Sequence, residues 1–226
     1  MVKEGRVRGF ELPLSGHQMV SWVGNAFVTG MFYALNALVL FGPWCEPKMA
    51  TTVVLVVHLV LVVGGLVCWL FLEWQPPSRA SCISLGGSAR WKKTRYCREH
   101  KETIQGLDHF CTWLNVAIGA NNYLPFYCLA LFGTAQYALH AGLATFLAIT
   151  CDHLVARSLF GLAALLGFAL LCAYVALLSF HTYLAFQGMG TYDWILTHSE
   201  VEPSQEMTEK VQPGHDRRQT TTEEDP

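Results

Sequence analysis

The middle of the chain carries a carboxylate, an imidazole and a thiol within four consecutive positions, at Asp108, His109 and Cys111. A free cysteine is mostly protonated at neutral pH, whereas its thiolate is the nucleophile. A neighbouring histidine, with an ordinary pKa of about 6.5, can take the thiol proton, and a carboxylate can fix the imidazole tautomer and stabilise the imidazolium. The spacing therefore indicates a nucleophilic cysteine. The alternative is a chance Asp-His pair beside a small apolar residue at a helix start.

The surrounding sequence indicates a membrane protein, because 52% of the 226 residues are hydrophobic and only 14% are charged. Segments without Asp, Glu, Lys or Arg lie between Glu11 and Glu46, Lys48 and Glu73, Asp108 and Asp152, and Arg157 and Asp193. Each can hold the roughly 20 residues that a helix needs to cross the hydrocarbon layer. The sequence thus predicts an all-α membrane protein with four transmembrane helices and a cytosolic loop domain between helices 2 and 3.

These segments divide the chain into five parts. We predict a cytosolic N-terminal arm (1–18), transmembrane helices 1 and 2 (19–74), the loop domain (75–121), transmembrane helices 3 and 4 (122–186) and a cytosolic tail (187–226). The arm is charged and lacks an apolar centre, so we expect no cleaved signal peptide. The end of the tail is polar and poor in apolar residues, which favours disorder.

The basic residues predict the orientation in the membrane. Ten precede the first span or lie between spans 2 and 3, at Lys3, Arg6, Arg8, Arg79, Arg90, Lys92, Lys93, Arg95, Arg98 and Lys101, whereas the other two loops hold only Lys48 and Arg157. By the positive-inside rule, both termini and the loop domain are cytosolic. Cys111 then faces the reducing side, while Cys45 and Cys151 lie at lumenal helix ends, where a disulfide could persist.

Four polar residues lie inside the predicted spans, namely Asn25, Asn36, His58 and His140. Intramembrane ionisable groups can mark a substrate or ion pathway. The other interpretation is a neutral side chain hydrogen-bonded to a neighbouring helix. We favour this structural role for all four.

Residues 97–126 resemble the cysteine-rich domain of the DHHC-type protein S-acyltransferases, the palmitoyltransferases. The matching positions are Asp108, His109, Phe110 and Cys111 for the Asp-His-His-Cys motif, followed by Trp113, Asn115, Gly119, Asn122 and Phe126. A second block, with His181, Tyr183, Leu184 and Gly190-Thr191-Tyr192-Asp193, stands where the family carries its Thr-Thr-x-Glu motif after the fourth span. Residues 11–23 also resemble the start of the first span in some animal members.

The chain departs from the family at the zinc ligands. The family loop binds two zinc ions, yet the ligand positions here fall on Tyr96, Thr103, Phe110 and Ala117, with the upstream cysteines near Ile83 and Gly86. Cys97 keeps its type, His100 is a possible replacement and Cys82 is one residue out of register. A structural zinc site takes four protein ligands, so we expect no zinc. Packing of Phe110, Trp91 and Trp113 against each other or the membrane face would hold the loop instead.

The resemblance implies an acyl transfer from palmitoyl-CoA or another long-chain acyl-CoA, through an acyl-enzyme on Cys111, to cysteines of substrate proteins. His109 would act as base and Asp108 would orient it. The implied supporting residues are Thr191, Asn122, Trp113 and Asn115, and the candidates for the CoA phosphates are Arg90, Lys92, Lys93 and Arg95. The expected partners are acyl-CoA, substrate proteins and the bilayer of an endomembrane, ER or Golgi, with no nucleic acid.

Two other functions remain open at this point. The missing zinc ligands permit a catalytically degenerate family member that acts as a membrane scaffold or adaptor. The intramembrane histidines and asparagines permit a transporter or channel. The intact Asp108, His109 and Cys111 set favours the enzyme.

Overall fold

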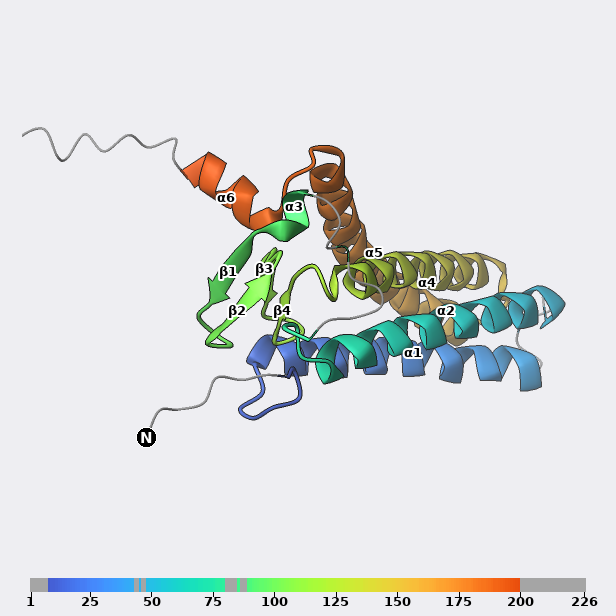
Figure 1. The fold of residues 1–226 in the computed structure, drawn as a ribbon. Coiled ribbons are helices and arrows are strands. Elements are labelled where there is room, and N and C mark those ends of the chain that lie inside the picture. Colours follow the sequence, from blue (N-terminus) through green and yellow to red (C-terminus); the bar gives the residue numbers. More distant parts are fainter. Residues whose placement is uncertain (1–7, 43–44, 46–47, 80–84, 86–88, 200–226) are drawn as a thin grey trace, which may run out of the picture.

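The computed structural model describes residues 8–42, 45, 48–79, 85 and 89–199. Four long helices form a bundle with a small strand-containing domain at one end (Figure 1). The long helices are α1 (Gly16–Phe41), α2 (Lys48–Trp74), α4 (Tyr123–Thr150) and α5 (Leu154–Phe186), and the short ones are α3 (Ala89–Lys92) and α6 (Thr191–Ser199). The candidate zinc ligand Cys82 and the end of the tail expected to be disordered lie outside the described residues.

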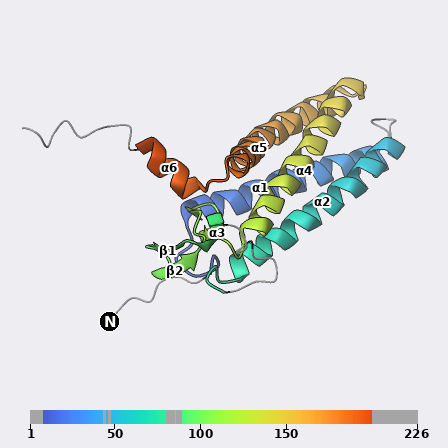
Figure 2. The ribbon, with the colours of Figure 1, turned by 45° about the horizontal axis from the view of Figure 1, so that its top comes forward.

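Three of the described helices, α1, α2 and α5, are long and apolar enough to cross a membrane. The predicted third span corresponds to α4, which has 28 residues but is not among those three. α4 packs against both α2 and α5 (Figure 2). Its buried positions include small residues such as Ala130 and Gly133 and the polar Gln136. Such residues suit contact with other helices rather than with lipid.

The prediction of an all-α protein is wrong for the loop domain. Strands β1 (Thr94–Cys97) and β2 (Glu102–Gln105) form one antiparallel pair, and β3 (His109–Cys111) and β4 (Val116–Ile118) form another. Strands of three or four residues are too short to give a periodic apolar pattern. Aromatic and β-branched residues such as Tyr96, Ile104, Val116 and Ile118 nevertheless suit a pleated, half-buried surface.

The polar residues inside the bundle have structural partners. The His58 Nδ1 lies 2.9 Å from the Tyr33 hydroxyl, and the His140 Nε2 lies 3.2 Å from a backbone carbonyl of α5. Asn25 accepts hydrogen bonds from two tyrosines, one on α4 and one on α5. Asn36 instead donates to a carbonyl of its own helix. These contacts favour structural roles over an ion pathway.

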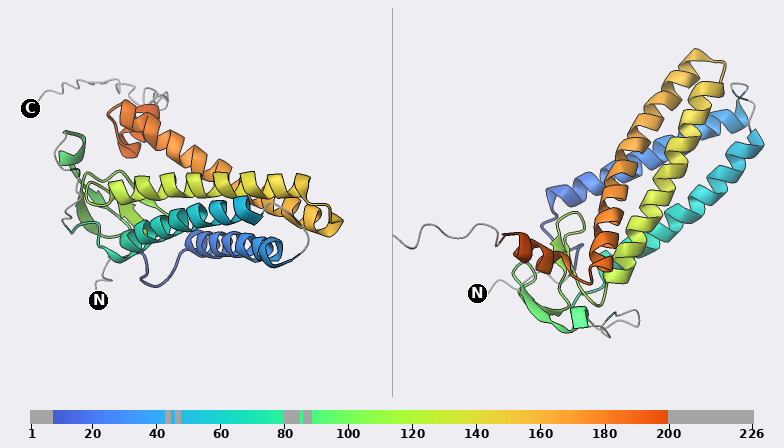
Figure 3. Two further views of the ribbon diagram at one scale, coloured as in Figure 1. Left: turned by 90° about the vertical axis from the view of Figure 1, so that its right-hand side faces the viewer. Right: turned by 90° about the horizontal axis from the view of Figure 1, so that it is seen from above.

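A disulfide joins Cys45 and Cys151 at the end of the bundle opposite the strands. Both cysteines belong to an apolar cluster that also contains Val39 of α1, Leu147 of α4 and Phe160 of α5. The loop domain and α6 lie together at the other end (Figure 3). The bundle therefore separates the disulfide from the residues of the candidate site.

Candidate active site

Cys111 and His109 lie on one face of strand β3, because side chains two residues apart in a strand point the same way. Phe110, between them, points to the opposite face and stands across from Ala117 of β4. Phe110 and Ala117 pack in one apolar cluster, whereas Cys111 packs against another that contains Val116. The alternation of a three-residue strand thus presents the imidazole and the thiol together.

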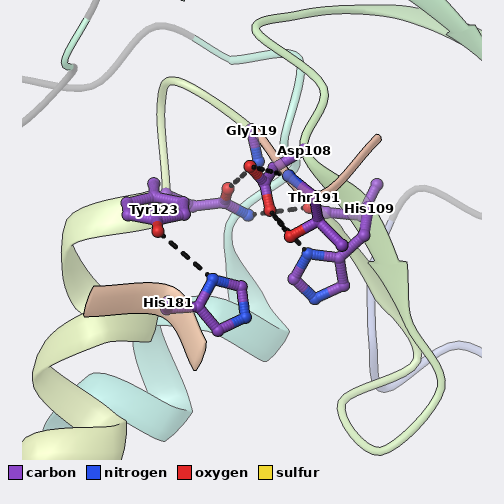
Figure 4. Close-up of polar contacts among 8 residues, drawn as sticks. Asp108, His109, Gly119, Tyr123, His181 and Thr191 are labelled. Atoms are coloured by element: carbon purple, nitrogen blue, oxygen red, sulfur yellow. Dashed lines mark hydrogen bonds and ion pairs between the residues drawn. The ribbon is translucent and has the colours of Figure 1, made fainter. Parts of the chain in front are cut away.

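The carboxylate of Asp108 is buried, with 1% exposure, and accepts three hydrogen bonds. Its Oδ2 accepts from the His109 Nδ1 at 2.9 Å and from the Thr191 hydroxyl at 2.6 Å, and its Oδ1 accepts from the Thr191 backbone N–H at 3.1 Å (Figure 4). The Asp108 carbonyl also accepts from the Tyr192 N–H at 3.0 Å. Thr191 and Tyr192 begin α6, whose first amides have no partner inside the helix. Asp108 therefore caps α6 and is held in place by it.

The hydrogen bond with Asp108 fixes the tautomer of His109. A carboxylate only accepts, so the Nδ1 of His109 carries a proton and Nε2 is left to interact with Cys111. Burial lowers the pKa of His109, but hydrogen bonds with Asp108 and Cys111, together with their charges, raise it to about 9. His109 is therefore mainly an imidazolium at neutral pH. A protonated histidine beside a cysteine favours the thiolate form of that cysteine.

Two residues that the sequence analysis did not place in the site enclose the imidazole of His109. The ring of Phe126 lies 5.3 Å from that of His109, and the ring of His181 lies 5.4 Å from it. The His181 Nδ1 lies 3.2 Å from the Tyr123 hydroxyl, as Figure 4 shows. Phe126 and His181 stood in the two sequence blocks. The resemblance implied that Thr191 of the second block supports the site, but it did not place either ring beside His109.

A comparison with family models finds a match to the DHHC palmitoyltransferase family over residues 84–198, just over half of the chain. The chain belongs to the DHHC palmitoyltransferase family. Members of this family are acyltransferases that use acyl-CoA. No curated protein gives a significant match to the chain.

Asn122, a supporting position of the DHHC motif, ties the strands to α4. It stands directly before α4, is buried, accepts from the Gly119 N–H at 2.8 Å and donates to the Ala117 carbonyl at 3.0 Å. A Cβ at Gly119 would lie 2.9 Å from the Gln105 carbonyl oxygen, so the backbones approach closely there. Asn122 therefore fixes the exit of β4 toward the helix.

Asn115 and Trp113, the other two supporting positions, lie in the turn between β3 and β4. Asn115 has a φ of 54°, which asparagine tolerates better than most residues. Its side chain is 1% exposed and donates to the Gly9 carbonyl at 3.4 Å. Trp113 is half exposed and its ring lies 5.1 Å from that of His17. Both residues thus contact the N-terminal arm.

The described residues of this DHHC family member do not fit a zinc site at the family positions. Phe110 and Ala117 face each other, and neither can bind a metal. His100 Nε2 accepts a hydrogen bond from the Ala117 N–H at 3.0 Å. Cys97 packs with Phe110 and Ala117 and donates to Glu99. Cys97 and His100 alone fall short of the four ligands that a structural zinc takes.

The three aromatic residues expected to pack together contact different parts of the structure. Trp91 lies 4.7 Å from the ring of Tyr123, measured between ring centroids, and belongs to the apolar cluster beside Cys111. Phe110 lies in the cluster on the other side of the strands, and Trp113 contacts His17. The prediction that the three side chains pack against each other is therefore wrong. Their packing against the membrane face stays a prediction.

The four candidates for the CoA phosphates differ in their surroundings. Lys92 and Lys93 are exposed, whereas the side chain of Arg90 lies outside the described residues. Arg95 forms an ion pair with Asp193, and its guanidinium lies 4.3 Å from the ring centre of Tyr192. Arg95 is therefore already engaged with α6, and the exposed lysines are better placed to meet an anion.

Proposed function

We propose that this protein is an S-acyltransferase. It moves a long-chain fatty acyl group, such as palmitoyl, from acyl-CoA to cysteines of substrate proteins at the cytosolic face of the membrane. The observation that carries the proposal is the hydrogen-bonded series from Thr191 through Asp108 to His109, with Cys111 on the same strand face as His109. Membership of the DHHC palmitoyltransferase family supports the same chemistry.

In the first step, the Cys111 sulfur attacks the thioester carbonyl of acyl-CoA while its proton resides on His109. A bond forms between the Cys111 sulfur and the acyl carbon, and the bond between that carbon and the CoA sulfur breaks. The imidazolium returns its proton to the departing CoA thiolate. Asp108 stabilises the imidazolium through the hydrogen bond at Nδ1.

In the second step, a cysteine of the substrate protein takes the acyl group. Its thiol loses a proton to the neutral His109, its sulfur attacks the acyl carbon, and the Cys111 thiolate leaves. Phe126 and His181 beside the imidazole exclude water from that side, which favours thiol over water as the acceptor.

The surroundings of Cys111 suit a donor with an apolar tail and an anionic head. Cys111 packs against the same buried apolar cluster as Trp69 of α2, Tyr127 of α4 and Leu177 of α5. An acyl chain that extends from the thiol can therefore lie among the helices. Lys92 and Lys93, exposed on the loop domain, are our candidates for the CoA phosphates.

We further propose that all four long helices cross the membrane, with both termini cytosolic. α4 has 28 residues, is packed between α2 and α5, and carries no Asp, Glu, Lys or Arg. The basic loop domain lies at one end of the bundle and the disulfide at the other, which matches a cytosolic and a lumenal side. This arrangement suits a multi-pass protein of the ER or Golgi.

The test is acyl-enzyme formation. Purified protein is incubated with a clickable palmitoyl-CoA, and the adduct is treated with hydroxylamine, which cleaves thioesters. We expect a hydroxylamine-sensitive adduct on the wild type and on Cys172→Ser, a control at an exposed cysteine of α5, but none on Cys111→Ser. No adduct on the wild type, or an equal adduct on Cys111→Ser, would refute the proposal and favour the scaffold function that the missing zinc ligands permit.

A further inference from the structure

The turn between β3 and β4 begins directly after Cys111 and contacts the N-terminal arm at each of its four residues. These residues are Thr112, Trp113, Leu114 and Asn115. β3 and β4 have three residues each, and an isolated two-stranded hairpin is marginally stable. Contacts from outside the hairpin must therefore contribute to holding the turn, and with it the thiol.

We propose that residues 8–18 form a strap that positions Cys111 for acyl transfer, with Ser15 and Gly9 as positioning residues. This inference rests on the proposed function, but the contacts of the strap are independent of it. No role in the chemistry itself is assigned to the strap, because its side chains reach the turn rather than the reacting sulfur.

One end of the strap contacts the turn through Ser15 and His17. The Ser15 hydroxyl donates to the Thr112 carbonyl at 2.7 Å, and the ring of His17 lies 5.1 Å from that of Trp113. The same Ser15 oxygen accepts from the Gln18 N–H and caps α1. Ser15 thus links the start of a long helix to the residue that follows Cys111.

The other end of the strap contacts the turn through Gly9. The Gly9 carbonyl accepts from the Asn115 side chain at 3.4 Å. A Cβ at Gly9 would lie 2.7 Å from the Leu114 carbonyl oxygen and 3.0 Å from the Glu73 Cγ. Both distances are shorter than van der Waals contact, so only glycine fits between the turn and α2.

The strap is itself anchored on α2 by a buried carboxylate. Gly9 N–H donates to the Glu73 carbonyl at 3.0 Å, and Gln18 Nε2 donates both to Glu73 Oε2 at 3.1 Å and to the Gly9 carbonyl at 2.9 Å. Trp22 and Trp69 donate to the other carboxylate oxygen. Glu73 is fully buried, so this anchor is fixed by several bonds at once.

Aromatic side chains pack beside the Glu73 anchor of the strap. The ring of Phe10 lies 5.7 Å from those of both Trp22 and Trp69 and 6.5 Å from that of Trp74. The strap therefore connects two helix ends to the turn after Cys111. A movement of the strap would change the distance between the thiol and His109, whose ring is held separately by Asp108.

Two substitutions test the strap with little change of volume. Ser15→Asp keeps a good helix cap but places a group that only accepts beside the Thr112 carbonyl, so the contact with the turn is lost. Ser15→Thr keeps both the cap and the donor and is the matched control. Gly9→Ala adds one methyl group against the Leu114 carbonyl.

The first measurement is the pH dependence of Cys111 alkylation by iodoacetamide, quantified by peptide mass spectrometry. The second is the single-turnover rate of acyl-enzyme formation as a function of palmitoyl-CoA concentration. We expect Ser15→Asp to shift the alkylation profile to higher pH and to lower the maximal rate about 3- to 10-fold, the effect of one lost hydrogen bond. Gly9→Ala, which pushes the turn away by steric contact, should change both quantities in the same direction. The palmitoyl-CoA concentration that gives the half-maximal rate should be unchanged in both variants. Ser15→Thr should match the wild type in both measurements.

An unshifted alkylation profile in both Ser15→Asp and Gly9→Ala would overturn the proposal, even if their thermal stability fell, because the arm would then be only structural. A wild type that forms no acyl-enzyme refutes the proposed function instead. The alkylation profile still tests the strap in that case, since it requires no acyl donor.

Discussion

The substitution Asp108→Asn tests the most specific feature of the site, the control of the His109 tautomer. The Thr191 backbone N–H is a fixed donor to one carboxylate oxygen, whereas the Thr191 hydroxyl can rotate and also accept. The asparagine therefore turns its oxygen to the N–H and its NH₂ to the hydroxyl and to His109. His109 Nδ1 must then accept, and Nε2 carries the proton. An Nε2 that is already protonated cannot take the proton of Cys111.

The expected loss is about 100- to 10,000-fold in the rate of acyl-enzyme formation. The lower value follows from the pKa of His109, which is raised from 6.5 to about 9. At about 1.4 kcal/mol per unit, this shift stabilises the imidazolium by roughly 3 to 4 kcal/mol, part of it through Asp108. The upper value is the effect of the same tautomer inversion in Ser-His-Asp triads, about 10⁴-fold.

The assay is single-turnover formation of the hydroxylamine-sensitive adduct, combined with the pH profile of Cys111 alkylation. In the wild type, the raised pKa of His109 keeps the imidazolium beside the thiol below about pH 9, so alkylation proceeds at neutral pH. In Asp108→Asn, burial and the loss of the carboxylate lower the pKa of His109, and alkylation of Cys111 at neutral pH should fall.

The control is Asp152→Asn, which removes the same charge at an exposed position just past the far end of α4. It should form the adduct at the wild-type rate. A wild-type rate and an unshifted alkylation profile in Asp108→Asn would refute the assignment of Asp108 and His109.

Three further predictions concern the neighbouring contacts. Thr191→Val removes the 2.6 Å hydrogen bond to Asp108 and should slow adduct formation about 10-fold or more, since hydrogen bonds to charged groups contribute about 1.5–3 kcal/mol. Thr191→Ser should form the adduct at the wild-type rate. Equal rates in the Val and Ser variants would contradict the role of the Thr191 hydroxyl. Treatment with a zinc chelator should leave adduct formation unchanged, because two family ligand positions are Phe110 and Ala117; a loss that added zinc restores would show the opposite. Cys45 and Cys151 should resist maleimide labelling until a reductant is added, and labelling of both under non-reducing conditions would exclude the disulfide.

The sequence alone was sufficient to predict the long helices and to select Asp108, His109 and Cys111 as the candidate reacting groups. Long segments without charge predict membrane-length helices because a charge in hydrocarbon is costly. The region predicted for helices 1 and 2, residues 19–74, begins inside α1 and ends with α2. The order Asp-His-x-Cys predicts a nucleophilic thiol because these side chains differ in acid–base chemistry. Both conclusions follow from residue type and local spacing.

The loop domain could not be predicted in this way, because its strands are too short for a periodic pattern and its contacts join distant residues. That Phe110 faces Ala117 depends on the register of β3 and β4. Arg95 had been a candidate for the CoA phosphates, but its partner Asp193 is 98 residues away. The N-terminal arm had no predicted role, although Ser15 reaches Thr112 across 97 residues.

The sequence by itself thus determined the long apolar helices and the three groups that we propose for acyl transfer. Only the tertiary structure decided how those groups are held. It places α6 against Asp108, the arm against the turn after Cys111, and an apolar cluster where the family binds zinc. The physical reason is that helix length and side-chain chemistry are local properties, whereas hydrogen bonds between segments depend on the packing of the whole chain.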